Sequence, residues 1–190
     1  MRIITGKAKG TRLKTPKGAS TRPTADRVRE SVFSILGDIT GVLVLDLFAG
    51  TGSLGLEALS RGAAGAFFVD KATFDLLREN LLLCRLQKGE VFRRDVFSAL
   101  SAFEKEGRVF DLVFCDPPYH QGLVGRVLER ISPLLAAGGL FVAEMEAEEE
   151  APSCGLELAR KVGYGRTAQV LFYKKPLEAR HEKSCMYRKF

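Results

Sequence analysis

The chain contains 190 residues, of which 46% are apolar and 27% charged, a balance that is ordinary for one globular domain. No apolar stretch approaches the roughly 18 residues of a membrane span, and the N-terminus lacks the apolar core of a signal peptide. We therefore expect a cytoplasmic protein that has no membrane anchor, with a monomer as its default state.

The four cysteines lie far apart in the chain and form no C-x-x-C pair, which argues against structural zinc and against a disulfide framework. Two of them, Cys84 and Cys115, lie in apolar runs, where a cysteine usually serves as a small buried apolar residue. We expect reduced thiols and no bound metal.

The net charge of +6 is distributed unevenly along the chain. Residues 1–36 contain nine Lys or Arg against two acids, and residues 174–190 contain six against two. The middle of the chain is therefore net negative, with an acidic run that includes Glu144. Two basic ends favour a surface that binds a polyanion, although basic ends can also serve solubility alone.

The N-terminal residues predict a small basic hairpin, with extended pieces at residues 2–5 and 11–13. A helix follows, with Thr24 as its N-cap and Gly37 after its end. Apolar strands then alternate with helices: the strands are predicted at residues 42–47, 66–70, 90–93, 109–115 and 139–145, and the helices at 53–61, 72–86, 97–105 and 123–135, the last interrupted by Pro133. Two further strands, 156–162 and 168–173, read as an antiparallel hairpin.

This alternation predicts an α/β fold with a seven-stranded, mostly parallel, doubly wound sheet that ends in an antiparallel hairpin. We divide the chain into a basic N-terminal arm (1–23), the main domain (24–175) and a basic C-terminal tail (176–190). In such sheets ligands bind beyond the carboxyl ends of the strands, near the point where the strand order reverses.

A glycine-rich turn follows the first strand of the predicted sheet. Gly50 and Gly52 belong to a G-x-G-x-x-G pattern that fits nicotinamide enzymes as well as other nucleotide-binding proteins. Asp46, just before this turn, would repel a pyrophosphate and favours a ligand that carries positive charge. The sulfonium and ammonium groups of S-adenosylmethionine meet that requirement, and the glycines would let the backbone approach it closely.

Two further acids follow the next strands. Asp70 ends the second strand, where an acid commonly accepts hydrogen bonds from ribose hydroxyls. Asp95 follows the third strand and is placed to accept from an adenine amine, with Phe97 over the ring. Alternatively, Asp95 caps the helix that begins near Phe97, because Asp is a favoured N-cap residue.

The sequence Asp116-Pro117-Pro118-Tyr119 follows the fourth strand. A carboxylate and a backbone carbonyl held by prolines can accept both N–H bonds of an amine, and an aromatic ring can stack on the base that carries it. Asp-Pro and Pro-Pro are also common turn signals, so the position at a strand end beside the glycine turn gives the motif its weight. We assign Asp116, Pro117 and Tyr119 to the target amine.

The order of these motifs resembles class I S-adenosylmethionine-dependent methyltransferases that modify amines. Residues 3–6, 10–13 and especially 22–30 are similar to the RsmD family, which methylates the N2 amine of one guanine in 16S ribosomal RNA. The resemblance runs from about residue 2 to residue 173. It implies a Rossmann-like methyltransferase fold, S-adenosylmethionine as the methyl donor, and 16S ribosomal RNA or the small ribosomal subunit as the partner.

Carried over by position, the resemblance implies donor binding at Asp46, Gly50, Gly52, Asp70 and Asp95. The arginines of the arm and the first helix would meet RNA or close over the donor: Arg12, Arg22, Arg27 and Arg29. Two features depart from the family pattern, the single acid at Asp70 and the tail beyond residue 176. Rival functions are methylation of adenine N6 in DNA or of another amine, and a non-catalytic role in ribosome assembly.

Overall fold

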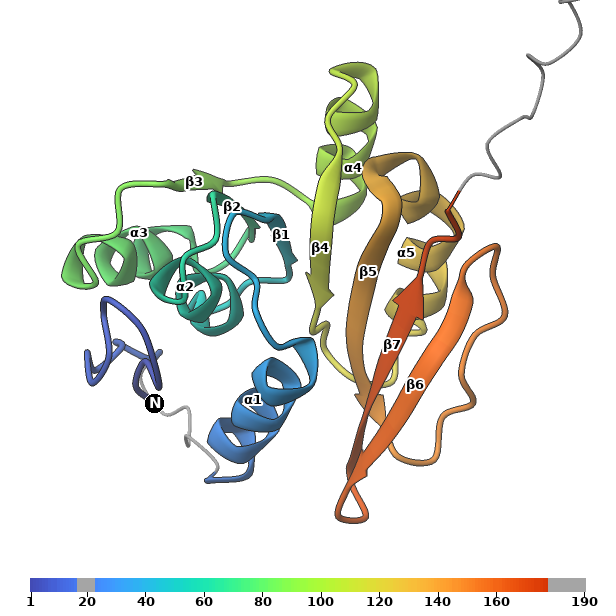
Figure 1. The fold of residues 1–190 in the computed structure, drawn as a ribbon, viewed down its shortest axis with the longest axis horizontal. Coiled ribbons are helices and arrows are strands. Elements are labelled where there is room, and N and C mark those ends of the chain that lie inside the picture. The colour runs from blue at the N-terminus through green and yellow to red at the C-terminus, as the bar shows by residue number, and fades with distance from the viewer. Residues whose placement is uncertain (17–22, 178–190) are drawn as a thin grey trace, which may run out of the picture.

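The structure, a computed structural model, describes residues 1–16 and 23–177. Within these residues the chain forms one sheet with helices against both of its faces (Figure 1). The strands are β1 (Leu43–Leu47), β2 (Gly65–Val69), β3 (Gly89–Phe92), β4 (Phe110–Cys115), β5 (Leu135–Glu146), β6 (Glu157–Tyr164) and β7 (Ala168–Lys174). The helices are α1 (Pro23–Leu36), α2 (Ser53–Ser60), α3 (Phe74–Leu83), α4 (Val96–Lys105) and α5 (Leu123–Ile131).

The described strands form a seven-stranded sheet in the order β3-β2-β1-β4-β5-β7-β6. Strands β1 to β5 pair in parallel, whereas β7 is antiparallel to both β5 and β6. The order reverses between β1 and β4, and this reversal is the switch point at which ligands bind in such sheets. The predicted doubly wound sheet with its antiparallel C-terminal pair is confirmed.

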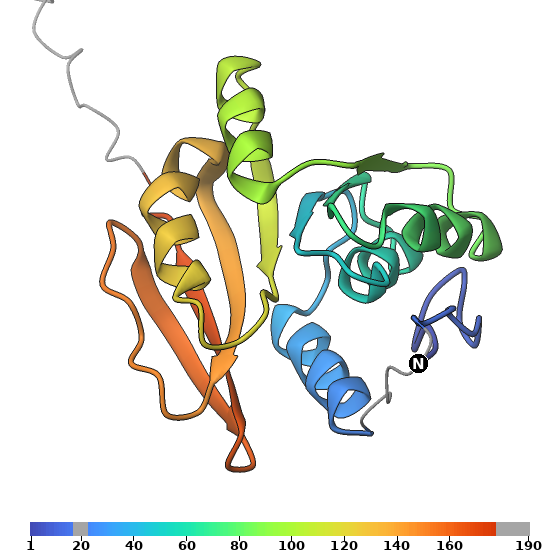
Figure 2. The same ribbon diagram turned by 180° about the vertical axis from the view of Figure 1, so that it is seen from behind.

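Successive residues of the central strands face opposite layers of the protein. In β1, Leu45 and Leu47 pack in a core with α4 and α5, whereas Val44 packs in a second core with α1, α2 and α3. Seen from behind, α4 and α5 lie in front of the strands (Figure 2). The residue that shares the face of Val44, Asp46, therefore points into the layer formed by α1 to α3.

Helix α1 packs an apolar stripe against the sheet. Val28, Val32 and Phe33 are buried, and the ring of Phe33 lies 5.7 Å from that of Phe114 in β4. The helix begins at Pro23, so Thr24 lies within its first turn and not at the predicted N-cap position. Its end at Leu36, before a left-handed glycine, agrees with the prediction.

The predicted fifth helix of the main domain extends too far. Helix α5 ends at Ile131, a 3-10 turn covers Ser132–Leu134, and β5 begins at Leu135 instead of residue 139. Pro133 has no backbone N–H and cannot continue the helical hydrogen bonding, so the chain leaves the helix here. Strand β5 can begin early because Leu135 pairs with Phe110, at the first residue of β4.

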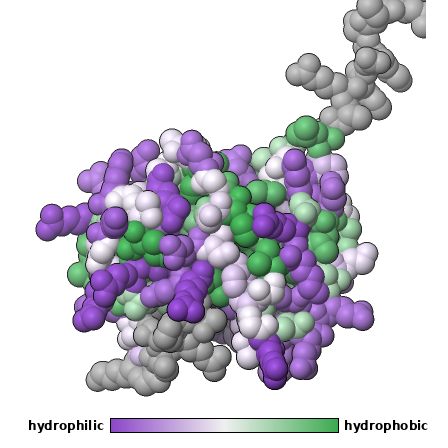
Figure 3. All heavy atoms as spheres, turned by 60° about the horizontal axis from the view of Figure 1, so that its bottom comes forward, coloured by the Kyte–Doolittle hydropathy of each residue, from purple (hydrophilic) through white to green (hydrophobic). Residues whose placement is uncertain are grey.

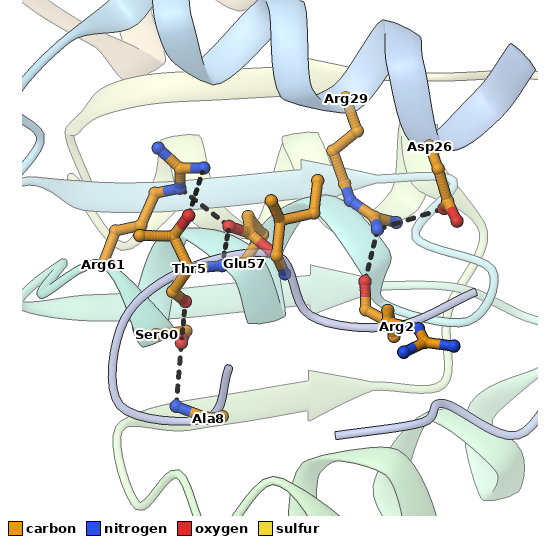
Figure 4. A network of polar contacts seen from close by, with 9 residues as sticks. Arg2, Thr5, Ala8, Asp26, Arg29, Glu57, Ser60 and Arg61 are labelled. Atoms are coloured by element: carbon orange, nitrogen blue, oxygen red, sulfur yellow. Dashed lines mark hydrogen bonds and ion pairs between the residues drawn. The ribbon is translucent and has the colours of Figure 1, made fainter. Parts of the chain in front are cut away.

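The N-terminal arm is a hairpin, as predicted, with an antiparallel bridge between Arg2 and Arg12. It is firmly joined to α2 through Glu57, a fully buried carboxylate. The carboxylate accepts hydrogen bonds from the backbone N–H groups of Ile4 (2.7 Å) and Thr5 (3.0 Å) and pairs with Arg61 (2.8 Å; Figure 4). The first 16 residues therefore belong to the packed body of the domain.

Candidate active site

The parallel register brings carboxylates together at one edge of the sheet. Cys115 at the end of β4 lies opposite Ala143 in β5, so the next residues, Asp116 and Glu144, occupy neighbouring positions on adjacent strands. Asp70, just after β2, lies at the same edge. The sheet thus gathers acidic side chains at its switch point, where a ligand would bind.

Asp46 anchors the glycine turn from within the protein. Its side chain is only 1% exposed, and its Oδ2 accepts a hydrogen bond from the backbone N–H of Gly55 in the first turn of α2 (2.9 Å). Burial, and then the nearby charges of Asp116 and Asp70, raise the pKa of this carboxyl well above its ordinary value, although the Gly55 bond opposes the shift. Asp46 is therefore held against the start of α2 and is almost closed to solvent.

The three glycines of the turn have different tasks. A Cβ at Gly52, whose φ is 80°, would lie 2.8 Å from a methyl carbon of Leu77, and a Cβ at Gly55 would lie 2.3 Å from the ring of Phe68. Both glycines therefore allow close packing inside the protein. A Cβ at Gly50 would meet nothing nearer than 3.9 Å, so only the backbone at Gly50 borders open space.

Asp70 holds the same turn from the neighbouring strand. Its Oδ2 accepts from the N–H of Gly50 (2.9 Å), and its Oδ1 accepts from the N–H groups of Ala72 (2.8 Å) and Thr73 (2.7 Å). Because the residue is half-buried, part of the carboxylate still reaches the edge of the sheet. The predicted donor acid is thus also the clamp that sets the glycine backbone.

Asp95 is the N-cap of α4, one of the two alternatives that the sequence left open. Its Oδ1 accepts from the backbone N–H groups of Phe97 (3.0 Å) and Ser98 (3.1 Å). The residue is exposed, so its carboxylate remains accessible to solvent although Oδ1 caps the helix. Phe97 is half-buried and lies under the guanidinium of Arg126, 4.3 Å from the ring centroid.

The turn after β4 combines an acid and an aromatic residue. The Tyr119 hydroxyl donates a hydrogen bond to Oε1 of Glu144 (2.7 Å). Solvent reaches Asp116 at the mouth of a pocket, but the surrounding protein displaces much of the water that would hydrate its carboxylate. This desolvation, and then the negative charge of Glu144, raise the pKa of Asp116 to about 7.

Next to Asp116 lies a small pocket of about 70 Å³ between α1, the start of α2 and strands β4, β5 and β7. Its polar lining comes from Arg29, Ser53, Asp116 and Glu144, with valines between them. Figure 3 shows the molecule from the side on which β4 and β5 end, with apolar patches among hydrophilic residues. A larger open groove of about 550 Å³ lies elsewhere, beside Lys7, at the far end of α2.

In the sequence, Glu144 stands out only as part of an acidic run. Alternation along β5 places it on the same face as Val142, which packs against α1, and the β4 register then sets it beside Asp116. The alternation is visible in the sequence, but the register is not. His120, which we left outside the site, is exposed and its Nδ1 lies 2.9 Å from Glu146.

The predicted RNA-binding arginines separate into two groups. Arg12 and Arg27 are exposed, whereas Arg29 is 3% exposed and donates to the backbone carbonyl of Arg2 while pairing with Asp26 (Figure 4). An exposed phosphate contact by Arg29 is therefore wrong for this structure, because its guanidinium ties α1 to the arm. Arg22 lies outside the described residues.

The remaining predictions concern thiols, metals and membranes. Cys84 and Cys115 are buried, and burial raises the pKa of the Cys84 thiol to about 11, which keeps it protonated. Among residues 1–16 and 23–177, no group of three or more metal-binding side chains comes together. The helices in this part of the chain are all too short or too polar to cross a membrane.

Comparison with known proteins gives consistent relatives over most of the chain. The profile of a family described as "Conserved hypothetical protein 95" matches residues 1–174. The chain is 42% identical to YlbH of Bacillus subtilis (strain 168), covering 92% of this chain and 99% of that protein. It is 35% identical to "Ribosomal RNA small subunit methyltransferase D" of Escherichia coli (strain K12), covering 92% and 90%. Among solved structures, yhhF from Escherichia coli superposes with a TM-score of 0.79 at 35% identity, covering 93% of this chain and 98% of that one.

Proposed function

Because this chain belongs to the family described as Conserved hypothetical protein 95, the RsmD family that its motifs resemble, we propose that it methylates the N2 amine of a guanine in small-subunit ribosomal RNA. The name of the Escherichia coli relative supports ribosomal RNA of the small subunit as the substrate. The observation that carries the proposal is the position of Asp116, open to solvent beside the glycine turn and next to Glu144.

The donor half fits S-adenosylmethionine. Open space borders Gly50, and Asp70 acts electrostatically on the buried Asp46, so a cationic ligand would relieve the repulsion between these two carboxylates. We assign the ribose hydroxyls to Asp70, and the adenine to Asp95 and Phe97. When bound, S-adenosylmethionine supplies an electron-poor methyl carbon attached to a sulfonium sulfur, which is released as a neutral thioether.

On the acceptor side, Asp116 and the Pro117 carbonyl would accept the two N–H bonds of the guanine amine. The lone pair of that nitrogen is delocalised into the ring, and holding both N–H bonds favours a more tetrahedral nitrogen whose lone pair points toward the methyl carbon. Each such charge-assisted hydrogen bond contributes roughly 1.5–3 kcal/mol. Positioning the two reactants contributes more, up to roughly 7–11 kcal/mol in well-oriented reactions.

Asp116 also stabilises the positive charge that develops on the amine nitrogen. As the nitrogen–carbon bond forms, the amine becomes cationic, and the carboxylate beside it stabilises that charge and accepts the departing proton. Its raised pKa makes it a better proton acceptor than an ordinary aspartate. Tyr119 would stack on the base after it leaves its helix, with the ring held by the hydroxyl bond to Glu144.

The exposed arginines of the arm and α1 would contact RNA phosphates. Arg12 and Arg27 come from two elements that Arg29 ties together, and we assign both to one basic surface. Phosphate contacts of this kind fix the position of the nucleic acid and carry no base specificity. Base selection must therefore come from the pocket next to Asp116.

The proposal is tested by transfer of a labelled methyl group from S-adenosylmethionine to small-subunit ribosomal RNA. The purified protein is incubated with naked 16S ribosomal RNA and, separately, with assembled small subunits prepared from cells that lack it. We expect label in RNA in at least one of the two. Absence of label in both, with donor binding intact by calorimetry, would favour the non-catalytic role and overturn the proposal.

A further inference from the structure

Glu144 is the one acidic side chain of the pocket that no motif explains. It lies near the C-terminal end of a paired strand, β5, and is half-buried. Its Oε1 accepts the Tyr119 hydroxyl, while its Oε2 has no hydrogen-bond partner among the described residues. An acid held beside Asp116 in this way is costly for the free protein, because two neighbouring carboxylates repel each other.

The pair of carboxylates has a chemical counterpart in only some bases. In guanine the N2 amine is next to N1–H, so two donors lie side by side on one edge. In adenine and cytosine the amine is next to a ring nitrogen that accepts hydrogen bonds. A second carboxylate beside the first would accept from guanine, whereas it would oppose the lone pair of the other two bases.

The pocket also contains an unmatched donor. Nε of Arg29 is buried and has no hydrogen-bond partner in the described part of the chain. A ligand that carries an acceptor on the same edge as its two donors would suit such a pocket, and guanine has O6 there. This buried donor is independent of the two carboxylates, and it points to a ligand of the same kind.

We propose that Glu144 selects guanine by accepting its N1–H through Oε2, while Asp116 and the Pro117 carbonyl hold the N2 amine. This inference rests on the proposed function and identifies the residue that gives it base specificity. Two donors facing two carboxylates offset the repulsion between the acids. A base with an acceptor in that place leaves both lone pairs unpaired, and sites built to hydrogen-bond a group reject analogues that lack it.

The test uses RNA in which the target guanine is replaced by 2,6-diaminopurine. This base keeps the 2-amino group but has an acceptor at N1 in place of N1–H and an amino group in place of O6, so the variant described below is needed to assign the effect to N1. For the wild type we expect kcat/KM to favour guanine by about ten- to hundred-fold, as for one well-made base contact. Because this measurement needs no variant, a ratio near one would by itself overturn the proposal.

Glu144→Gln then asks whether this side chain is the cause. The amide can still bond the Tyr119 hydroxyl and can donate to N1 of the analogue, so the preference for guanine should shrink. Glu146→Gln is the matched control on the same strand, and it should keep the wild-type ratio. Equal losses on both bases in Glu144→Gln would show a structural role only and overturn the assignment. If the wild type methylates neither RNA, the proposed function itself fails.

Discussion

The turn after β1 and the turn after β4 both place carboxylates at the ends of parallel strands, yet they use them differently. In the first turn, Asp46 and Asp70 accept backbone N–H bonds and thereby set the glycine conformation. At the second, Asp116 and Glu144 line a pocket. The donor half is thus largely built before a ligand arrives, whereas the acceptor half stays electrostatically unsatisfied until a substrate supplies donors.

This contrast makes a general point about acids at strand ends. A motif identifies that a carboxylate is present, but its role depends on how many protein donors already occupy it. We therefore expect substitutions in the first turn to change stability or donor affinity, and substitutions in the second to change turnover. The predictions below test that division, from the largest effect to the smallest.

The largest effect is expected from Asp116→Ala. Loss of the carboxylate removes a hydrogen-bond acceptor and the proton acceptor, so kcat should fall by about 10²- to 10⁴-fold. The Kd for S-adenosylmethionine, measured by calorimetry, should change little, because the donor half keeps all of its own bonds. Asp116→Asn, which retains one acceptor oxygen, should lie in between. Loss of donor binding in Asp116→Ala would show that the two halves are not separate.

Gly55→Ala tests the opposite half. The added Cβ would lie 2.3 Å from the Phe68 ring and 3.0 Å from Oδ2 of Asp46, so the free energy of unfolding should fall by about 1–3 kcal/mol. Gly125→Ala, on α5, is the matched control: its Cβ would meet nothing nearer than 3.8 Å, and the helix should tolerate or gain from it. Urea unfolding of both variants makes the comparison. Equal stability of the two would contradict the tight packing of the glycine turn.

The pH dependence of kcat/KM reports on Asp116 in the free enzyme. Ionised Asp116 is the active form, so kcat/KM should rise with pH through about 7 and then level off. Glu144→Gln removes a cause of the raised pKa, and the rise should move to lower pH. Stability changes in the other direction: the folded state holds the Asp116 proton more tightly than the unfolded state, so this residue's contribution falls as pH increases from about 4 to about 7. If the pH dependence of kcat/KM were the same in Glu144→Gln and the wild type, Glu144 would not be a cause of the raised pKa of Asp116.

The smallest effect is expected on RNA binding. Arg27→Gln should weaken association without changing base preference, and each lost phosphate contact should reduce the slope of log K against log salt by about 0.7–0.9. Arg108→Gln is the control, because Arg108 precedes β4 at the opposite edge of the sheet. Binding titrations at several salt concentrations measure both slopes. Equal slopes for Arg27→Gln and the wild type would show that Arg27 does not contact an RNA phosphate.

The alternation of apolar strands with helices was enough to predict the sheet and its switch point, and the acids and glycines that follow the strands indicated which residues lie at that edge. These patterns could not show that Asp46 is buried under Gly55, because this depends on how α2 packs over the strand. The sequence does not show Glu144 as a site residue, because its place beside Asp116 depends on the β4–β5 register. Pairing between strands is a tertiary property that the sequence of one strand does not contain.

Arg29 is different, because the signal was present in the sequence. It lies four residues before Phe33 and next to Val28, so helical periodicity already places it on the buried side of α1. The basic block of three arginines therefore contains one residue that faces the protein interior. Arg27, one position outside the stripe, is exposed as expected. Phase along the helix is thus a better guide to which arginines are exposed than charge density.

The most direct test of the central claim is the identity of the methylated nucleoside. Small-subunit ribosomal RNA methylated by the purified protein is digested to nucleosides and analysed by mass spectrometry against standards. Our account predicts N2-methylguanosine with the wild type and far less of it with Asp116→Ala in the same time. N6-methyladenosine, or methylation of guanine at an atom other than N2, would contradict it.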